Sequence, residues 1–221
     1  MRSSVKMKNN VKKRTYDSSG RRQAAEATRA SILNAARQVF LEKGYAAATM
    51  PKIAQAAGIA LDTVYATVGK KPAVFHLLIE MAISGVDTPI PAEERDYVRA
   101  IRQAASVEDK LKIYAAAIAR IQPRLAPLVA LLREAAQQDA ELEALWKSIA
   151  DRRAANMLLF AQDLVDTGRI RADLSLQKIA DILWSMNAPE FYLLLTQGRG
   201  WSTEEFEDWL ATAWIRFLVQ P

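Results

Sequence analysis

The sequence predicts an all-α protein in which a small N-terminal module precedes a larger helical domain. Apolar residues recur at the three- and four-residue spacing of amphipathic helices, and no stretch alternates as a half-buried strand would. Capping residues and glycines divide the chain into successive helices. We expect a basic disordered arm over residues 1–22, a three-helix module over 23–72 and a helical domain over 73–221.

Composition limits the kinds of chemistry that the chain can perform. It has 221 residues, of which 51% are hydrophobic, so it can bury a sizeable core. It has no cysteine, which excludes disulfides and thiolate sites, and its one histidine, His76, leaves no Cys–His pair and no histidine-rich metal site. Adjacent glutamates stand at expected helix starts, where the helix dipole explains them. We predict no enzymatic activity, no metal and no cofactor.

Targeting signals are missing from the sequence. No apolar run near the N-terminus resembles a signal peptide. The most hydrophobic stretch, ILWSMNAPEFYLLL, is too short to cross a bilayer and contains Glu190. We expect a cytoplasmic protein.

The charges are divided unevenly along the chain. Residues 1–72 hold 14 Lys and Arg against four acids, a net charge of +10, whereas residues 73–221 hold 16 against 21, a net charge of −5. This asymmetry predicts a basic module that meets a polyanion. The arm over residues 1–22 is either a solvated leader or a segment that touches phosphates, and the sequence leaves both readings open.

Two helices are expected at the start of the module. The spacing of Ile32, Val39 and Phe40 predicts an amphipathic helix from about residue 24, which ends at Gly44. Thr49 has the character of an N-cap, and Pro51 is tolerated in the first turn that follows. This second helix ends at Gly58.

The segment LDTVYATVGKK, residues 61–71, begins only two residues later and predicts a third helix that crosses the second steeply. This is the helix-turn-helix pattern. Leu61, Val64 and Val68 can face the first helix. The outward face is small and bears hydroxyls, so it can enter a major groove without steric conflict. This face consists of Asp62, Thr63, Ala66 and Thr67.

The segment TMPKIAQAAGIALDTVYATVGKKPAVF, residues 49–75, resembles the DNA-binding segment of the TetR family of transcriptional regulators. The resemblance rests on the threonine cap, the Ile-Ala pair, the Ala-Gly turn, the Thr-x-Tyr motif and the lysine before the fourth helix. It implies phosphate contacts from Thr49, Tyr65 and Lys71, and base-edge proximity for Ala60, Leu61, Asp62 and Thr63. The predicted DNA-binding surface also includes Ala66, Thr67 and Lys70.

The sequence departs from the family pattern at three positions. Thr67 and Val68 stand where the family commonly has His-Phe, so a threonine hydroxyl replaces any histidine contact with phosphate. Ala60 replaces the usual serine cap. Asp62 has two readings: it favours the helix macrodipole, or it accepts a hydrogen bond from a cytosine amino group.

Further helices follow to the end of the chain. We expect a fourth helix to end near Gly85, a loop over DTPIP, and a capping box formed by Ser106 and Asp109. Pro123 and Pro127 are expected to mark the entry to another helix. The remaining expectations are a long helix from Asp139 to Gly168, a helix from Ser175 to Gly198 that Pro189 kinks, and a last helix capped by Ser202 and Glu205.

Aromatic residues concentrate near the C-terminus, where eight of the 17 follow Leu183. Helices that are apolar on more than one face must be buried, in the protomer or against a partner. The family resemblance implies a homodimer formed by the last two helices. The predicted interface residues are Tyr192, Trp209, Trp214 and Phe217.

The resemblance also implies a cavity that binds a small apolar or amphipathic effector. The predicted lining residues are Tyr114, Trp146, Met157, Phe160, Trp184 and Asn187. The resulting function is a ligand-responsive, homodimeric repressor that binds a palindromic double-stranded DNA operator. The alternative is a basic-tailed helical scaffold that binds DNA without sequence preference or ligand control.

Overall fold

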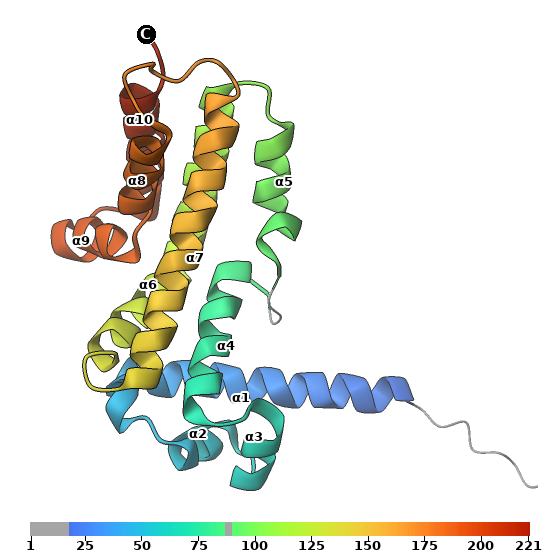
Figure 1. Cartoon of the computed structure of the whole chain (residues 1–221). Helices are drawn as coiled ribbons and strands as arrows, with labels where there is room; N and C mark the ends of the chain where they lie inside the picture. The colour runs from blue at the N-terminus through green and yellow to red at the C-terminus, as the bar shows by residue number, and fades with distance from the viewer. Residues whose placement is uncertain (1–17, 87–89) are drawn as a thin grey trace, which may run out of the picture.

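The computed structural model describes residues 18–86 and 90–221, and over these ranges the chain is almost entirely helical (Figure 1). Within these residues, β-type pairing is limited to one isolated antiparallel bridge between Ile170 and Val219. Most of the predicted arm, residues 1–17, lies outside the described residues. Residues 18–22, which the sequence places in the arm, belong to the first helix.

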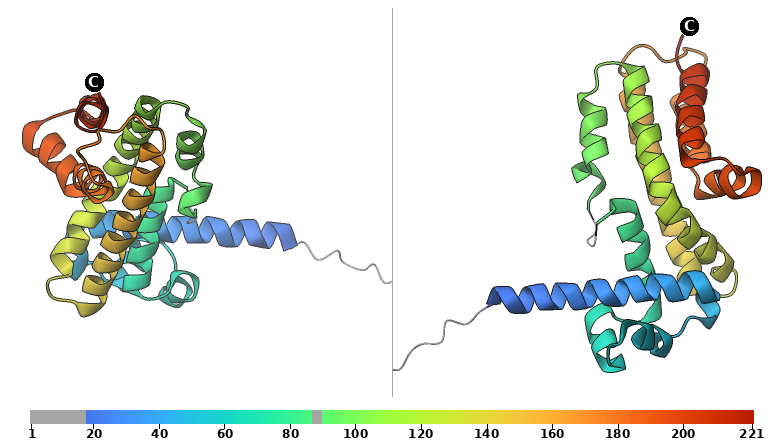
Figure 2. Two further views of the ribbon diagram at one scale, coloured as in Figure 1. Left: turned by 45° about the horizontal axis from the view of Figure 1, so that its top comes forward. Right: turned by 180° about the vertical axis from the view of Figure 1, so that it is seen from behind.

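The first three helices form the head of the molecule. Gly44, with φ of 74°, interrupts α1 near its end, at the position where the sequence predicts the helix to stop. The N-terminal half of α1 extends beyond the rest of the molecule, and residues 20–27 are exposed (Figures 1 and 2). The head consists of α1 (Ser18–Ala47), α2 (Met50–Ala57) and α3 (Leu61–Val68).

The remaining helices form an upper domain above the head. In Figure 1, α4 rises from the head, α6 descends toward the head and α7 rises beside it, α5 covers one side, and α8, α9 and α10 cover the other. The elements are α4 (Lys71–Ser84), the short helix η1 (Ala92–Glu94), α5 (Asp96–Gln103), α6 (Val107–Ala135), α7 (Ala140–Val165), α8 (Leu176–Met186), α9 (Pro189–Arg199) and α10 (Thr203–Leu218).

The predicted caps stand at the starts of the helices. Ser202 and Glu205 form a complete capping box, with reciprocal bonds of 3.1 and 2.7 Å. Ser106 accepts a bond from the Asp109 amide. Side-chain oxygens of Thr49, Asp139 and Ser175 cap α2, α7 and α8 in the same way.

The prolines behave differently from the predictions. Pro123 and Pro127 lie inside α6, not at its entry, and in Figure 2 the C-terminal part of α6 turns away from the axis of its first part. A proline in a helix removes a backbone donor and crowds the carbonyl four residues earlier, which bends the helix. Pro189 begins α9 at N1, where its missing N–H costs nothing. The predicted single kinked helix is therefore two helices, α8 and α9.

Helix α6 is the axis of the upper domain. It is long and apolar enough to cross a membrane by composition alone. However, it packs against α1, α4, α5, α7, α9 and α10, and many of its apolar side chains are buried within the protein. These contacts identify it as the central helix of a helical bundle.

Two clusters of buried side chains form the core. One fills the upper part of the upper domain around Trp214, Leu111 and Phe206. The other, which we call the head cluster, contains Phe40, Ile53 and Phe75, and it extends to Leu128, Leu132 and Leu142 of α6 and α7. The head therefore shares its core with the lower ends of the upper-domain helices.

Candidate functional site

Helices α2 and α3 are joined by a short turn that sets their relative orientation. Thr49 accepts a bond of 3.4 Å from the Lys52 amide at the start of α2. Gly58 adopts φ of 66° at its end, a conformation that favours glycine, and the Ile59 amide bonds to the Ala54 carbonyl. This geometry holds α3 on the surface at the bottom of the head (Figure 1).

Helix α3 presents two different faces, as its sequence predicts. Val64 and Val68 are buried in the head cluster, and Leu61 is half-buried beside it. The opposite face carries side chains open to solvent, and the exposed fraction of Tyr65 is 43%. Exposed on this face are Asp62, Thr63, Tyr65 and Ala66, with Thr67 half-buried.

The polar groups of α3 are partly engaged within the helix. Ala60 is the N-cap and offers no side-chain bond, and Asp62 stands in the first turn. The Thr67 hydroxyl donates to the Thr63 carbonyl at 2.7 Å. The Thr67 oxygen can still accept a bond from a ligand, but its proton is already used within the helix.

Lysines surround the ends of the helix pair. Lys70 is exposed, whereas the Lys71 ammonium lies 4.1 Å from the centre of the Tyr45 ring and donates to the Ala46 carbonyl at 3.4 Å. Burial lowers the pKa of Lys71. Lys52 donates to the neighbouring Ala47 carbonyl at 2.9 Å. Lys52 is not among the residues that the sequence predicts for the DNA-binding surface. Its place in the first turn of α2, beside Thr49, is the signal that could have added it to that set.

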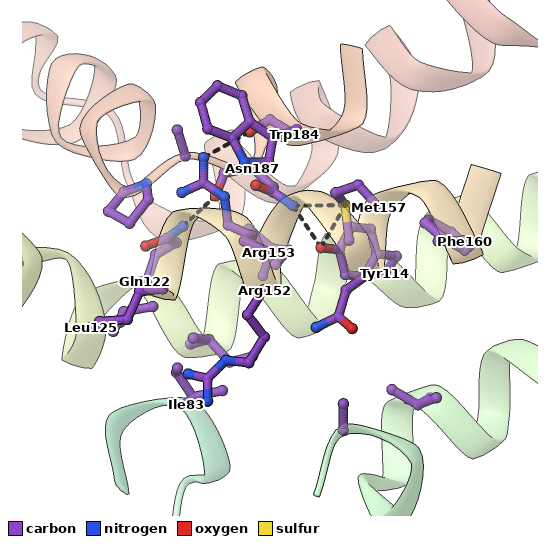
Figure 3. A pocket seen from close by; sticks show the side chains of 18 of the residues that line it. Ile83, Tyr114, Gln122, Leu125, Arg152, Arg153, Met157, Phe160, Trp184 and Asn187 are labelled. Carbon is purple, nitrogen blue, oxygen red and sulfur yellow. Dashed lines mark hydrogen bonds between the residues drawn. The ribbon is translucent and has the colours of Figure 1, made fainter. Parts of the chain in front are cut away.

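A cavity of about 690 Å³ lies in the upper domain, lined by α4, η1, α5, α6, α7, α8 and α9 (Figure 3). All six residues of the predicted pocket line it, and they come from three parts of the chain that are distant in sequence. They are Tyr114, Trp146, Met157, Phe160, Trp184 and Asn187.

Buried polar side chains join the helices at the floor of the cavity. Asn187 donates to the Tyr114 hydroxyl at 2.7 Å and to the Met157 sulfur at 3.0 Å. Gln122 donates to the Asn187 carbonyl at 2.7 Å. Burial raises the pKa of Tyr114 well above its usual range. The oxygens Oδ1 of Asn187 and Oε1 of Gln122 have no hydrogen-bond partner in the described part of the chain.

Arg153 of α7 also lines the cavity, and the sequence reasoning missed it. Its guanidinium lies 4.4 Å from the centre of the Trp184 ring and donates to the Trp184 carbonyl at 3.2 Å (Figure 3). A signal was present, because Arg153 shares the helical spacing of Met157, Phe160 and Leu164, the buried face of α7. An arginine on such a face indicates a polar group that enters the interior.

The four predicted interface residues occupy different environments. Trp214 is fully buried in the core of the protomer, and Tyr192 is also buried and bonds to Thr203 at 3.1 Å. Trp209 is half-buried and stacks on Phe191 with centroids 5.5 Å apart. Phe217 is exposed. Apolar periodicity could not separate Trp214 from Phe217, because both satisfy the pattern of a helix that is buried somewhere.

No group of three or more metal-ligating side chains occurs in residues 18–86 and 90–221. His76 is exposed, and its Nε2 lies 3.5 Å from a carboxylate oxygen of Glu80, one turn away on α4. This arrangement is an ordinary helical pair at i and i+4.

Comparisons with known proteins agree with this geometry. Residues 32–76 match the family described as bacterial regulatory proteins, tetR family. A search of curated protein sequences gives no match.

Three solved structures illustrate the likeness of the fold. Native NalD, the secondary repressor of the MexAB-OprM multidrug efflux pump in Pseudomonas aeruginosa, is 20% identical with a TM-score of 0.67, covering 88% of this chain and 98% of its own. SmeT in complex with triclosan is 18% identical with a TM-score of 0.64, covering 88% and 92%. A TetR-family regulator from Mesorhizobium loti is 20% identical with a TM-score of 0.62, covering 89% and 98%.

The resemblance predicted from the sequence is therefore confirmed, because the family match covers α2 and α3 and the fold likeness extends over most of the chain. The chain is a DNA-binding transcriptional regulator whose residues 32–76 match the tetR family of bacterial regulatory proteins.

Proposed function

We propose that this regulator is a homodimeric repressor that binds a palindromic operator through two copies of α3 and is released by a small-molecule effector in the cavity. The main support for this proposal is the position of helix α4 between the head and the cavity. Its first half contributes Val74 and Phe75 to the head cluster, and its last turn contributes Ile83 to the cavity wall. A single rigid element therefore contacts both the DNA-reading head and the effector site.

Polar contacts strengthen the connection between α4 and the cavity. Arg152 of α7 lines the cavity and forms an ion pair of 2.5 Å with Glu80. Arg124 of α6 donates to the Ala82 carbonyl at 3.3 Å. A ligand that moves α7 or α6 would therefore move α4 and the head. The effector then shifts the equilibrium between two head positions by as much as it favours one of them.

The reading surface is the exposed face of α3. Asp62 and Thr63 stand at its N-terminal end, where short polar side chains reach base edges, and Tyr65 and Lys70 are exposed beside them. Thr49, Ala60, Leu61, Ala66, Thr67 and Lys71 complete the proposed contact surface. Lys71 would leave the Tyr45 ring to reach a phosphate.

A second copy of the chain is proposed to pack on α9 and α10. Leu194 and Phe217 expose 63% and 53% of their surfaces there, and Trp209 is half-buried. Exposed apolar side chains of this size are typical of an interface. Tyr192 and Trp214 would support these helices from within the protomer. Phe217→Asp should give monomers in sedimentation, whereas Leu41→Asp, at an exposed site on α1, should leave dimers.

The decisive test of function is a footprint on the DNA that flanks the protein's own coding region, with unrelated duplex as competitor. Sequence-specific protection is expected. Thr63→Ala and Asp62→Ala should change the preferred bases at symmetric positions, at a cost of about 1 to 3 kcal/mol for each lost base contact. Tyr65→Phe should weaken binding to all duplexes alike.

Deletion of residues 1–17 separates this proposal from a DNA-binding scaffold. A repressor that reads through α3 should lose affinity mainly at low salt and keep its preferred sequence. If the deletion abolishes binding while the changes at Asp62 and Thr63 alter nothing, α3 is not the reading helix.

A further inference from the structure

Arg153 is half-buried at the cavity wall, and its guanidinium has no ion-pair partner among the described residues. One of its donors bonds to the Trp184 carbonyl at 3.2 Å, and the ring of Trp184 covers one face. Its Nε has no hydrogen-bond partner, and no carboxylate of the described residues forms an ion pair with it. Burial lowers the pKa of Arg153, because desolvation disfavours its charged form, and the nearby Glu190 opposes this shift without forming an ion pair with the guanidinium.

Such a group is costly for the free protein. A charge that is partly removed from water is usually paired, and a backbone carbonyl and an aromatic face compensate only part of the lost hydration. A guanidinium offers donors in a planar fork that matches a carboxylate. An anionic group placed beside Arg153 would therefore gain more than the same group placed on the protein surface.

The acidic side chains around the cavity offer no equivalent site for a cation. Asp163 is paired with Lys110 at 2.8 Å, and Glu190 lies 3.6 Å from Arg133. Glu93 is exposed to solvent. Within the described lining, five arginines face three carboxylates. The lining arginines are Arg95, Arg102, Arg133, Arg152 and Arg153.

Much of the rest of the wall is apolar, and Gln122, Asn156 and Asn187 add neutral polar groups to it. Ile118, Leu125 and Phe160 are examples from two helices, and a cavity of about 690 Å³ is within the range of sites for drug-sized molecules. The arrangement combines a half-buried guanidinium that has no ion-pair partner, that of Arg153, with a large apolar surface. It suits a molecule that has an apolar body and one negatively charged end.

We infer that the effector is an amphipathic organic anion whose carboxylate binds the guanidinium of Arg153 and whose apolar body fills the cavity toward Phe160. This inference rests on the proposed function, since it names the ligand class of the same effector site. It assigns charge selection to Arg153 and affinity for the body of the ligand to the apolar wall.

Matched ligands test the assignment by calorimetric titration of the full chain without DNA. One series has a decyl body and the other a naphthyl body. Each body carries a carboxylate, a hydroxyl or a quaternary ammonium as its polar end group. In at least one series, the carboxylate should bind roughly ten- to a hundredfold more tightly than the hydroxyl compound, the range for a hydrogen bond to a charged group.

Variants of Arg153 identify the source of the preference. Arg153→Gln should reduce the carboxylate's advantage over the hydroxyl compound to within about threefold, as expected when a neutral bond replaces a charged one. Arg153→Lys retains the charge but not the fork, and should keep an intermediate preference. Arg120→Gln removes an exposed arginine of α6 outside the cavity and should bind all ligands like the wild type.

Circular dichroism and the melting temperature establish that each variant is folded. The inference is wrong if no carboxylate compound binds the wild type, or if compounds with the three different end groups bind equally. It is also wrong if the ammonium compounds bind best, or if folded Arg153→Gln keeps the full preference for the carboxylate. In any of these cases, specific footprinting by α3 would still support the proposed regulator. Failure of the footprint with selective carboxylate binding would contradict the proposed function alone.

Discussion

The head cluster and the cavity use buried volume in opposite ways. In the head, Phe40, Tyr45 and Phe75 pack against one another with ring centroids 4.9 to 5.6 Å apart, and Ile53 and Val64 are fully buried around them. In the upper domain, an aromatic group of similar size, Tyr114 with Phe160, borders about 690 Å³ of space.

The polar groups follow the same division. The buried polar atoms without a partner in the described chain, such as Oδ1 of Asn187 and Nε of Arg153, lie beside or in the upper domain's core. The buried polar residues of the described chain, Lys110, Gln122 and Asn187, all belong to the upper domain. The head is therefore closely packed, whereas the upper domain leaves open space and unpartnered polar atoms beside its core.

Truncation of an aromatic ring should give the largest difference between the two regions. Phe75→Ala empties a close-packed site and should lower the free energy of unfolding by about 3 to 5 kcal/mol. Phe160→Ala removes a ring that already borders open space, so its loss should be smaller. Denaturant unfolding measures both variants. Equal losses would show that the cavity wall is as tightly constrained as the head.

Enlarging a side chain should also destabilise the head more than the cavity wall. Ile53→Phe overpacks the head and should cost about 1 to 3 kcal/mol, whereas Ile118→Phe has the cavity to occupy and should cost less. The same change at Ile118 should weaken binding of the preferred carboxylate ligand. Thermal unfolding and calorimetry check the two effects, and a larger loss at Ile118 would contradict the open space assigned there.

Removal of the helix caps compares how much a single N-cap side chain stabilises each region. Ser202→Ala breaks a complete capping box and should cost about 1 kcal/mol. Thr49→Ala breaks a longer bond of 3.4 Å and should cost less stability. If Thr49 also contacts a phosphate, its replacement should weaken DNA binding more than its effect on unfolding explains. An unchanged DNA affinity would limit Thr49 to capping.

The smallest effect concerns alkaline pH. Burial, with the nearby Asp139 and Glu141, raises the pKa of Tyr45 to about 12. The unfolded state then loses the phenolic proton more readily than the folded state, so stability from this group is present below about pH 10 and is lost as the pH rises toward 12. Wild-type unfolding free energy should fall more steeply over this window than that of Tyr45→Phe. Parallel slopes in urea titrations would rule out the effect.

The caps and the helix-turn-helix could be predicted because their causes are local. Thr49, Ser202 and Gly58 act on backbone groups within a few residues, and those residues are visible in the sequence. The cavity-lining set was predicted as a group of large side chains near the expected core.

Other features depend on contacts that are distant in sequence. The sequence is compatible with Pro189 either as a kink within one helix or as the first residue of a new helix. The choice depends on the different directions in which α8 and α9 pack. Pro123 and Pro127 remain helical because α6 has neighbours along its length. Trp214 satisfied an interface pattern but fills the protomer core, and Arg153 drew no attention because its partner Trp184 lies 31 residues away.

The extension of the head cluster into Leu128, Leu132 and Leu142 has a consequence for the modularity of this regulator. A fragment that ends near residue 72 would lose these three fully buried side chains together with Phe75, and the remaining apolar surface would face water. The head is therefore a recognition unit without being an independent folding unit. Transplanting it onto another regulator would succeed only if the recipient's helices supplied matching side chains at those positions.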